Sequence, residues 1–302
     1  MEFNINKTSF FIAKVLRRIP LSNGLKVEFN TYRHENINQK LLPFFLDAER
    51  EYRKEESFDS DNDNIWLFWW QGEKEMPDLV RYCFNSVKKN YDQKKVILIT
   101  KNNFYKYTNI SENILNLLED KKITLTHFSD ILRFNLLKNH GGLWLDATIF
   151  VNKKIEKSKF CDFYTCSGYD DKDYFFVTRG NWCGFLMGGA SNNELFSFMN
   201  SFFEIYWNNM DKLIDYFLID YALNYAWNKN IGGFKSFTKK NTRIDNPNLF
   251  GLQSKLNEKF NKSEWERLSQ NTGMFKLSYK KKLSNKNGTF YNVILQGRKY
   301  GH

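Results

Sequence analysis

The sequence predicts an α/β fold in which a buried parallel sheet is covered by helices. Residues 65–70 and 95–100 are short apolar runs, which is typical of strands that are buried on both faces. Between them, residues 77–91 carry apolar positions at helical spacing, which gives the strand-helix-strand order of an α/β unit. Ligands bind such sheets beyond the carboxyl ends of the strands, so we expect the functional site at that edge.

A capped helix, a glycine pair and a buried strand follow one another between residues 128 and 151. Ser129 or Asp130 is expected to cap the helix, and the glycines at 141–142 tolerate the positive φ angles that end a helix. Residues three apart share a helix face, so we expect Asp130 and Arg133 to lie together. The alternative is a plain intrahelical ion pair without a further role.

The strand expected at residues 143–151 contains a single charged residue, Asp146. Burial of an unpaired carboxylate costs on the order of several kcal/mol, so we interpret Asp146 as a functional residue. Strand alternation places Trp144, Asp146 and Thr148 on one face. The alternative is that backbone amides in a turn satisfy Asp146.

Composition and length limit the class of protein. The 302 residues suffice for one large domain or two small ones, and we predict an N-terminal helical region at 1–62 and a domain at 63–302. The four cysteines form no C-x-x-C pair and have no histidine at ligand spacing, which argues against a zinc site or a disulfide framework. Without a signal peptide or a membrane-spanning apolar run, a cytoplasmic protein is expected.

Positive charge is concentrated near the C-terminus. The net charge is +11, and residues 255–302 hold eleven Lys or Arg against three Glu. Such a surface suits nucleic acid, anionic lipid or a phosphorylated substrate, but nothing resembles a nucleic-acid-binding module, so no nucleic-acid partner is expected. Residues 10–19 form a basic amphipathic helix, which can contact the inner face of a membrane peripherally or pack on its own domain.

The second half of the chain is less regular. The expected elements are strands at 163–168 and 175–179 and helices at 194–207 and 211–227. Asp215 and Asp220 are almost the only charges of the last helix, so either is a candidate for a cleft-facing carboxylate. The alternatives are that Asp215 lies near a helix N-terminus for dipole reasons and that Asp220 pairs with a cation.

Six motifs occur in a fixed order over about residues 63 to 282. They are Ile65-Trp66, Gln71-Gly72, Ser129-Asp130-x-x-Arg133, Gly141-Gly142-x-Trp-x-Asp146-Ala-Thr148, Asp215-Tyr-Phe-x-x-Asp220 and Phe275-Lys-Leu-Ser-Tyr-Lys280. Together they resemble the capsular polysaccharide synthesis glycosyltransferases, relatives of glycosyltransferase family 32 and its D-x-D sugar-binding region. The resemblance implies a GT-A-like, Rossmann-type nucleotide-sugar-binding fold with added N-terminal and C-terminal helices.

The resemblance also implies a retaining glycosyltransferase that uses a nucleotide-sugar donor, with a UDP-sugar expected. Trp66 would stack on the nucleobase or line its pocket, and Gln71 would belong to the same donor site. Asp130 would accept from a ribose or sugar hydroxyl, and Arg133 would approach the sugar or the diphosphate. Asp146 takes the first position of the D-x-D motif.

The second aspartate of that motif is replaced by Thr148, a much weaker ligand for Mn²⁺ or Mg²⁺ than a carboxylate. A divalent cation at Asp146 and Thr148 is therefore one hypothesis. In a second, other acidic residues help to hold the ion; the candidates are Asp170, Asp171 and Asp173. In a third, lysines neutralise the leaving diphosphate instead of a metal, and Lys276 and Lys280 are the donor-binding candidates.

For retaining transfer, we expect the acceptor hydroxyl to attack on the face from which the nucleoside diphosphate leaves. A double displacement would require a carboxylate nucleophile, and Asp215 or Asp220 would supply it. The expected acceptor is a glycan on a lipid-diphosphate carrier in capsular or surface polysaccharide synthesis. The alternatives are a protein or soluble sugar acceptor, or a non-catalytic carbohydrate-binding protein of the same fold.

Overall fold

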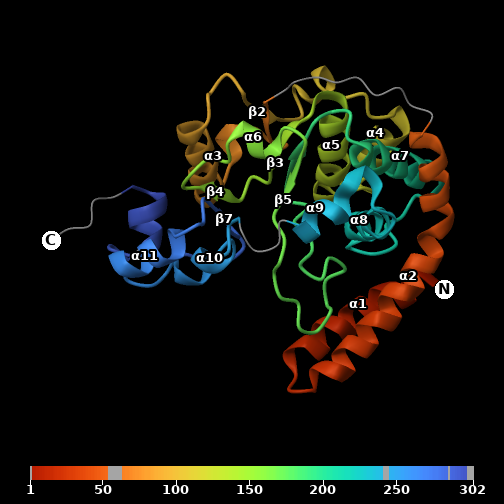
Figure 1. The fold of residues 1–302 in the computed structure, drawn as a ribbon, viewed down its shortest axis with the longest axis horizontal. Coiled ribbons are helices and arrows are strands. Elements are labelled where there is room, and N and C mark those ends of the chain that lie inside the picture. Colours follow the sequence, from red (N-terminus) through yellow and green to blue (C-terminus); the bar gives the residue numbers. More distant parts are fainter. Residues whose placement is uncertain (1, 54–62, 241–244, 285, 298–302) are drawn as a thin grey trace.

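The computed structural model describes residues 2–53, 63–240, 245–284 and 286–297. At its centre lies a five-stranded sheet in the order β2-β1-β3-β6-β5 (Figure 1). β1 pairs in parallel with β2 and β3, whereas β6 and β5 are added antiparallel. This mixed sheet with helices around it confirms the predicted α/β class, with added helices at both ends of the chain.

The elements have the following bounds. The large sheet contains β1 (Ile65–Phe68), β2 (Val96–Ile99), β3 (Gly142–Leu145), β5 (Phe163–Thr165) and β6 (Leu186–Gly189), and a small sheet contains β4 (Ile149–Val151) and β7 (Met274–Lys276). The helices are α1 (Glu2–Arg18), α2 (Asn23–Tyr52), α3 (Asp78–Asn90), α4 (Glu112–Glu119), α5 (Leu125–His140), α6 (Lys157–Phe160), α7 (Glu194–Asn209), α8 (Leu218–Lys229), α9 (Phe234–Lys240), α10 (Gly251–Lys255) and α11 (Lys262–Ser269).

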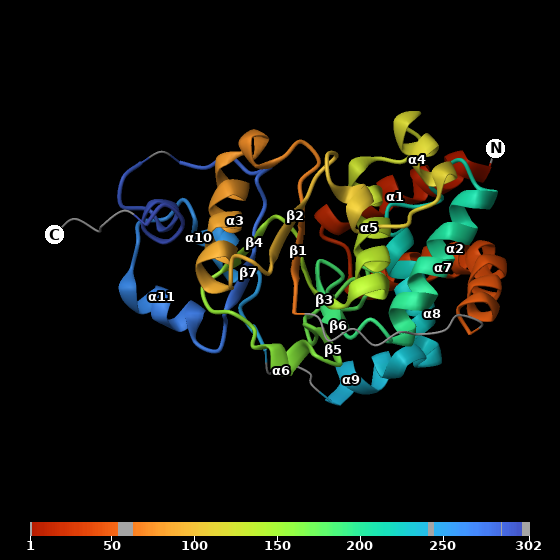
Figure 2. The ribbon, with the colours of Figure 1, turned by 90° about the horizontal axis from the view of Figure 1, so that it is seen from above.

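Helices cover both faces of the large sheet, with α3 on one side and α5, α7 and α8 on the other (Figure 2). Successive strand residues alternate between two cores. Trp66 and Trp144 join the core that includes α5 and α7, whereas Leu67 and Leu143 join the core that includes α3. Burial on both faces explains why these strands are continuous apolar runs in the sequence.

The glycine pair between α5 and β3 permits a direct passage from helix to sheet. Gly141 and Gly142 have φ angles of +64° and +96°, which side chains with a Cβ rarely adopt. A Cβ on Gly142 would lie 2.4 Å from the backbone oxygen of Asn64, and the Trp66 indole donates to the Gly141 carbonyl at 2.8 Å. The strand therefore starts at once beside β1, which brings the end of β3 close to the side chains of α5.

Two expectations for this central segment are corrected. α5 begins at Leu125 and is capped by Thr124, whose side chain accepts from the backbone of His127, so neither Ser129 nor Asp130 is the N-cap. The strand expected at 143–151 is two strands of different sheets, separated by a turn that contains Asp146. The chain leaves the large sheet after Leu145 because the following strand pairs with β7 instead.

Two expectations for the second half of the chain are also corrected. Residues 175–179 form turns rather than a strand, because Tyr174 and Arg179 adopt positive φ and the aromatic ring of Phe175 packs against α1. The helix expected from residue 211 begins only at Leu218, since Asp215 accepts from the backbone N–H of Phe217 at 2.8 Å.

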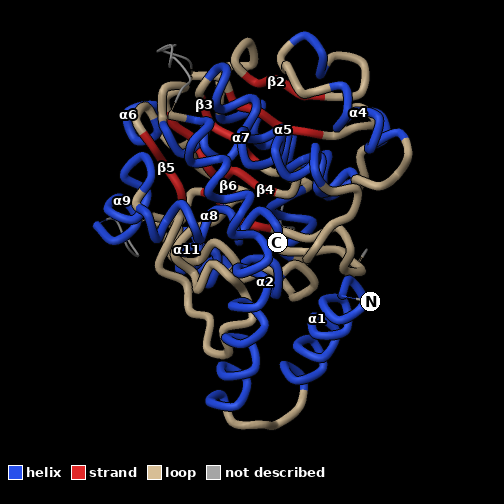
Figure 3. Tube along the Cα trace, turned by 90° about the vertical axis from the view of Figure 1, so that its right-hand side faces the viewer, coloured by secondary structure: helices blue, strands red, loops and turns tan. Residues whose placement is uncertain are grey.

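The N-terminal helices α1 and α2 form a hairpin whose connected end projects from the body of the protein (Figures 1 and 3). Apolar residues of α2, among them Leu41 and Phe45, belong to the core that also contains α5 and α7. The division of the chain at residue 62 stays a prediction, and that residue lies outside the described ones. A buried ion pair joins Arg33 of α2 to Asp215 at 3.3 Å, with both side chains only 1% exposed.

Arg33→Met is expected to lower the free energy of unfolding by about 3 kcal/mol, because it leaves the Asp215 carboxylate buried without its cation. Urea denaturation would measure the change. Arg50→Met is the matched control, because Arg50 pairs with Asp47 on the exposed surface and its loss should cost less than about 1 kcal/mol. Equal effects of the two substitutions would contradict the anchoring role of Arg33.

Candidate functional site

A cavity of about 510 Å³ lies at the carboxyl end of β3, the edge of the sheet where the sequence places a ligand. Its walls come from α5, from the segment after β3, from residues 169–185 and from the start of α8. The lining residues are Thr126, Asp130, Arg133, Asp146, Tyr169, Asp170, Asp171, Phe176, Thr178, Gly180, Trp182, Cys183, Gly184, Phe185, Tyr216, Phe217, Ile219, Asp220 and Phe250.

Asp146 is bound by cations on both of its oxygens. Its Oδ1 accepts from Arg133 at 3.3 Å and from the Trp144 indole at 3.0 Å, and its Oδ2 accepts from Lys276 Nζ at 2.6 Å. Burial by itself would raise the pKa of Asp146, but Lys276 and Arg133 outweigh burial and hold that pKa below its ordinary value. Asp146 is therefore ionised throughout the neutral range.

Lys276 reaches this site through the small sheet. It is paired with Ile149 in the antiparallel register of β4 and β7, and the backbone N–H of the next residue, Leu277, donates to the Thr148 carbonyl. Lys276 Nζ also donates to the Thr148 hydroxyl at 2.9 Å. The turn after β3 thus places Asp146 and Thr148 at the same cation, Lys276 Nζ. The single strand predicted over residues 143–151 is interrupted at this turn.

Arg133 links two carboxylates of the cavity. Its side chain is 4% exposed, and it lies 3.2 Å from Asp130 as well as 3.3 Å from Asp146. The pairing with Asp130 that the spacing predicts is therefore present. The guanidinium lies over the Trp144 ring at 5.1 Å, and its Nε has no hydrogen-bond partner among the described residues. A buried donor without a partner is costly.

Asp130 and Asp220 hold protons more readily than ordinary carboxyls. Burial raises the pKa of Asp130 to about 7, with Arg133 opposing and Asp146 adding to the rise. Burial raises the pKa of Asp220 to about 6, opposed by the Trp182 indole, which donates to Asp220 Oδ1 at 3.1 Å, and by Arg133. Near neutral pH the cavity therefore combines a fixed carboxylate with two carboxyls that can donate or accept a proton.

Aromatic side chains form much of the remaining wall. Three of them, Phe176, Tyr216 and Phe250, are exposed at the surface, and we call these three residues the aromatic rim. Sequence reasoning did not single them out; their only signal was the aromatic content of 18%. Ring faces of this kind suit the apolar faces of sugars and nucleobases.

Of the predicted site residues, six line the cavity together, and Lys276 and Thr148 adjoin it; the six are Asp130, Arg133, Asp146, Asp170, Asp171 and Asp220. Five others are not among the lining residues: Trp66, Gln71, Asp173, Asp215 and Lys280. Trp66 is 1% exposed within the core, so its ring presents no open face to a nucleobase. The Asp215 carboxylate is engaged by Arg33 and by the backbone of Phe217.

The residues present do not fit a divalent cation held between Asp146 and Thr148. Both side chains direct an oxygen at Lys276 Nζ, and the second Asp146 oxygen faces Arg133. In the part of the chain that the structure describes, no group of three or more His, Cys, Asp or Glu residues could hold a metal ion.

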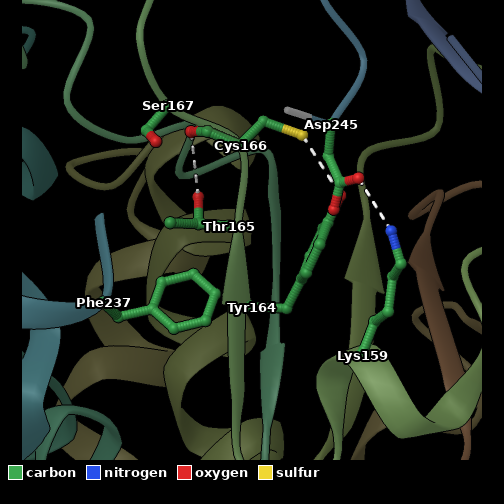
Figure 4. Close-up of a pocket in the computed structure, with 7 residues that line it drawn as sticks. All are labelled: Lys159, Tyr164, Thr165, Cys166, Ser167, Phe237 and Asp245. Carbon is green, nitrogen blue, oxygen red and sulfur yellow. Dashed lines mark hydrogen bonds and ion pairs between the residues drawn. The ribbon is translucent and has the colours of Figure 1, made fainter. Parts of the chain in front are cut away.

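A second, smaller cavity of about 240 Å³ lies between the ends of β5 and α6 (Figure 4). An ion pair of Lys159 and Asp245 at 2.7 Å borders it, and the Tyr164 hydroxyl lies 3.5 Å from Cys166 Sγ. Burial raises the pKa of the Cys166 thiol, which keeps it protonated and unreactive. We assign no chemistry to this cavity.

Fold and site together define an α/β protein with an acidic, aromatic-walled ligand cavity at the edge of its sheet. The family model described as capsular polysaccharide synthesis protein matches residues 17–294, and the chain belongs to this family. That match confirms the predicted relation to capsular polysaccharide synthesis, while the relation to glycosyltransferase family 32 and its D-x-D region stays a prediction.

Neither a search among curated proteins nor a search among solved structures found a match. Within the described residues, every helix is too short or too polar to span a lipid bilayer.

Asp220→Asn is expected to stabilise the protein at pH 8 by about 1–2 kcal/mol, because it removes a buried charge while Asn can still accept from Trp182. A raised pKa means that the folded state binds the proton more tightly, so the Asp220 contribution to stability falls as pH rises from about 4 to about 6. Urea unfolding at pH 5 and pH 8 would measure this. The exposed Asp211→Asn should change nothing, and an Asp220→Asn variant that is less stable at pH 8 would contradict the argument.

Proposed function

We propose that the protein is a glycosyltransferase that moves a sugar from a nucleoside-diphosphate sugar to a growing capsular glycan. The observation that carries this proposal is the convergence of Arg133 and Lys276 on Asp146, beside a cavity that also holds Asp130 and Asp220. Cations suit a diphosphate and carboxylates suit sugar hydroxyls, so one cavity offers both halves of a nucleotide-sugar site. Membership of the capsular synthesis family supports the same substrate class.

In this proposal the two cations bind the diphosphate and stabilise the charge that develops as it leaves. Asp130 and Asp220 accept hydrogen bonds from hydroxyls of the donor sugar. Because Trp66 is enclosed in the core, stacking on the nucleobase or sugar falls to the aromatic rim rather than to that tryptophan.

Transfer with retention then takes one of two routes. In the first, the acceptor oxygen forms its bond to the anomeric carbon as the bond to the diphosphate oxygen breaks on the same face, and the leaving diphosphate takes the acceptor proton. In the second, a carboxylate attacks the anomeric carbon as the bond to the diphosphate breaks, which forms a glycosyl ester. The acceptor oxygen then attacks the same carbon as the ester bond breaks, which frees the carboxylate, and the acceptor proton passes to the departing diphosphate. Asp220 is the candidate nucleophile for the second route, because Asp215 is held by Arg33 away from the cavity.

A donor panel tests the proposal. The protein is incubated with UDP-, GDP-, ADP- and dTDP-sugars, and free nucleoside diphosphate is measured together with the thermal shift that each donor causes. We expect one nucleotide class to be hydrolysed slowly without acceptor and to raise the melting temperature. Absence of both effects with every donor would contradict the proposal and favour a carbohydrate-binding protein.

Asp220→Asn is expected to reduce that donor hydrolysis by roughly 100-fold or more, because the cavity loses its carboxylate beside the proposed sugar site. Asp245→Asn is the matched control, since Asp245 lies at the smaller cavity and should leave turnover unchanged. Near-normal turnover of Asp220→Asn would exclude Asp220 as a nucleophile. Donor affinity measured by calorimetry would separate loss of binding from loss of chemistry.

A further inference from the structure

We propose that Lys276 takes the place of a divalent cation, so that the protein binds the diphosphate of its donor without a metal. This inference rests on the proposed function, because it concerns how the same cavity receives a nucleoside diphosphate. Lys276 Nζ contacts Thr148, the residue that the sequence has in place of a second aspartate.

The ammonium group of Lys276 is fixed in place. Its side chain is 21% exposed, and Nζ donates to Asp146 Oδ2 at 2.6 Å and to the Thr148 hydroxyl at 2.9 Å. It also lies 4.6 Å from the ring centroid of Phe185, which lines the cavity. An ammonium has three N–H donors, so two fix its position and the third is left for a phosphate oxygen.

Charge balance explains the threonine. Arg133 is shared between Asp146 and Asp130, whereas Lys276 pairs with Asp146 alone, so Lys276 is the cation that a diphosphate can also bind. A carboxylate at position 148 would add a second negative charge beside Lys276 and call for a doubly charged ion. A hydroxyl adds no charge and accepts one of the lysine's hydrogen bonds.

The lysine and a metal ion also exclude each other. A cation coordinated by Asp146 and Thr148 would need the oxygen lone pairs that face Nζ at 2.6 and 2.9 Å. At so short a distance, the metal ion and the ammonium group would repel each other strongly in a partly buried site. The metal could bind only after Lys276 had left.

Calorimetric titration of UDP and GDP tests the inference. We expect the better nucleotide to bind with the same dissociation constant, within about twofold, in EDTA and in Mn²⁺, and Lys276→Ala to weaken binding at least about tenfold. Lys262→Ala is the control, because Lys262 is 83% exposed on α11. Urea unfolding verifies that each variant is folded.

The double variant Lys276→Ala/Thr148→Asp supplies the converse. It removes the cation and restores two carboxylates, so it should bind Mn²⁺, seen as loss of the free-ion signal in electron paramagnetic resonance, and need Mn²⁺ for nucleotide binding. Wild-type binding that is lost in EDTA and restored by Mn²⁺ would overturn the inference and leave the proposed function standing. If neither nucleotide bound under any condition and no donor of the panel was hydrolysed or raised the melting temperature, the inference and the proposed function would both fail.

A separate surface supports a second inference: we infer that the tip of the α1–α2 hairpin, residues 11–25, docks on an anionic lipid bilayer. The tip projects from the body of the protein (Figures 1 and 3). It exposes large apolar side chains, with Phe11 65% and Leu25 57% exposed. The others are Ile12, Val15, Ile19 and Leu21.

The positive charge of this segment favours an anionic partner. Residues 11–25 contain no Asp or Glu and three basic residues: Lys14, Arg17, which pairs with Asp173, and Arg18. Apolar side chains flanked by basic ones match the interface of a bilayer that contains anionic headgroups. A second copy of the same tip would present like charges, which disfavours a dimer at this surface.

The same hairpin also holds a wall of the cavity. Arg17 pairs with Asp173 at 3.2 Å, and the Asn30 amide donates to the Asp173 carbonyl at 2.9 Å. Arg33 donates to the carbonyl of Phe175, next to Phe176 of the aromatic rim. A docked hairpin would thus hold this wall and the rim beside the bilayer, which suits an acceptor carried on a membrane lipid.

Vesicle sedimentation tests the docking. The full chain is expected to sediment with phosphatidylglycerol-containing vesicles and not with pure phosphatidylcholine, and Phe11→Asp/Leu25→Asp should weaken this binding at least about tenfold. Tyr105→Asp is the control, because Tyr105 is equally exposed outside the hairpin. Equal binding of the double variant, or binding that ignores the anionic lipid, would overturn the inference. Self-association of the wild-type protein that the double variant abolishes would also overturn the inference.

Discussion

The pairing of Asp146 with two cations is the interaction on which the arrangement of this site depends. A carboxylate at the end of a buried strand costs on the order of several kcal/mol unless it is neutralised. Here Arg133 comes from α5 and Lys276 from β7, two elements that are remote from each other in sequence. Gly141 and Gly142 at the start of β3, together with the turn after it, bring both cations to the same carboxylate. Side chains from α5, from the end of β3 and from the small sheet therefore meet at one ion cluster.

This pairing also divides the carboxylates by role. Asp146 holds the cations and stays ionised, whereas Asp220 has a tryptophan N–H as its hydrogen-bond donor and burial raises its pKa. Asp130 shares its cation, Arg133, with Asp146. Burial therefore outweighs that cation and raises the pKa of Asp130 as well. One cavity therefore contains a fixed anion for charge balance and two carboxyls suited to hydroxyl groups, because the cations are unequally distributed among them.

Local sequence patterns predicted the parts of the fold that depend on interactions between residues close in sequence. The apolar runs of β1 and β2 and the pair of Asp130 with Arg133 follow from period and spacing, and all are present. Long-range contacts decided the rest. Asp215 and Asp220 were equivalent in sequence, and Arg33, 182 positions from Asp215, gave them different surroundings. Lys276 was found only through its motif, because no local signal shows that β7 pairs with the strand after Asp146.

The added N- and C-terminal segments give the cavity two unlike ends. Lys276 belongs to a C-terminal strand that lies outside the large sheet, and it supplies the cationic end next to Asp146. The N-terminal hairpin fixes the loop that carries Phe176, and that end is aromatic and open to the surface. In the proposed function, the diphosphate of the donor binds at the first end and the apolar carrier of the acceptor lies at the second. The central sheet is therefore a common frame, and the segments outside it make the two ends of the cavity chemically different.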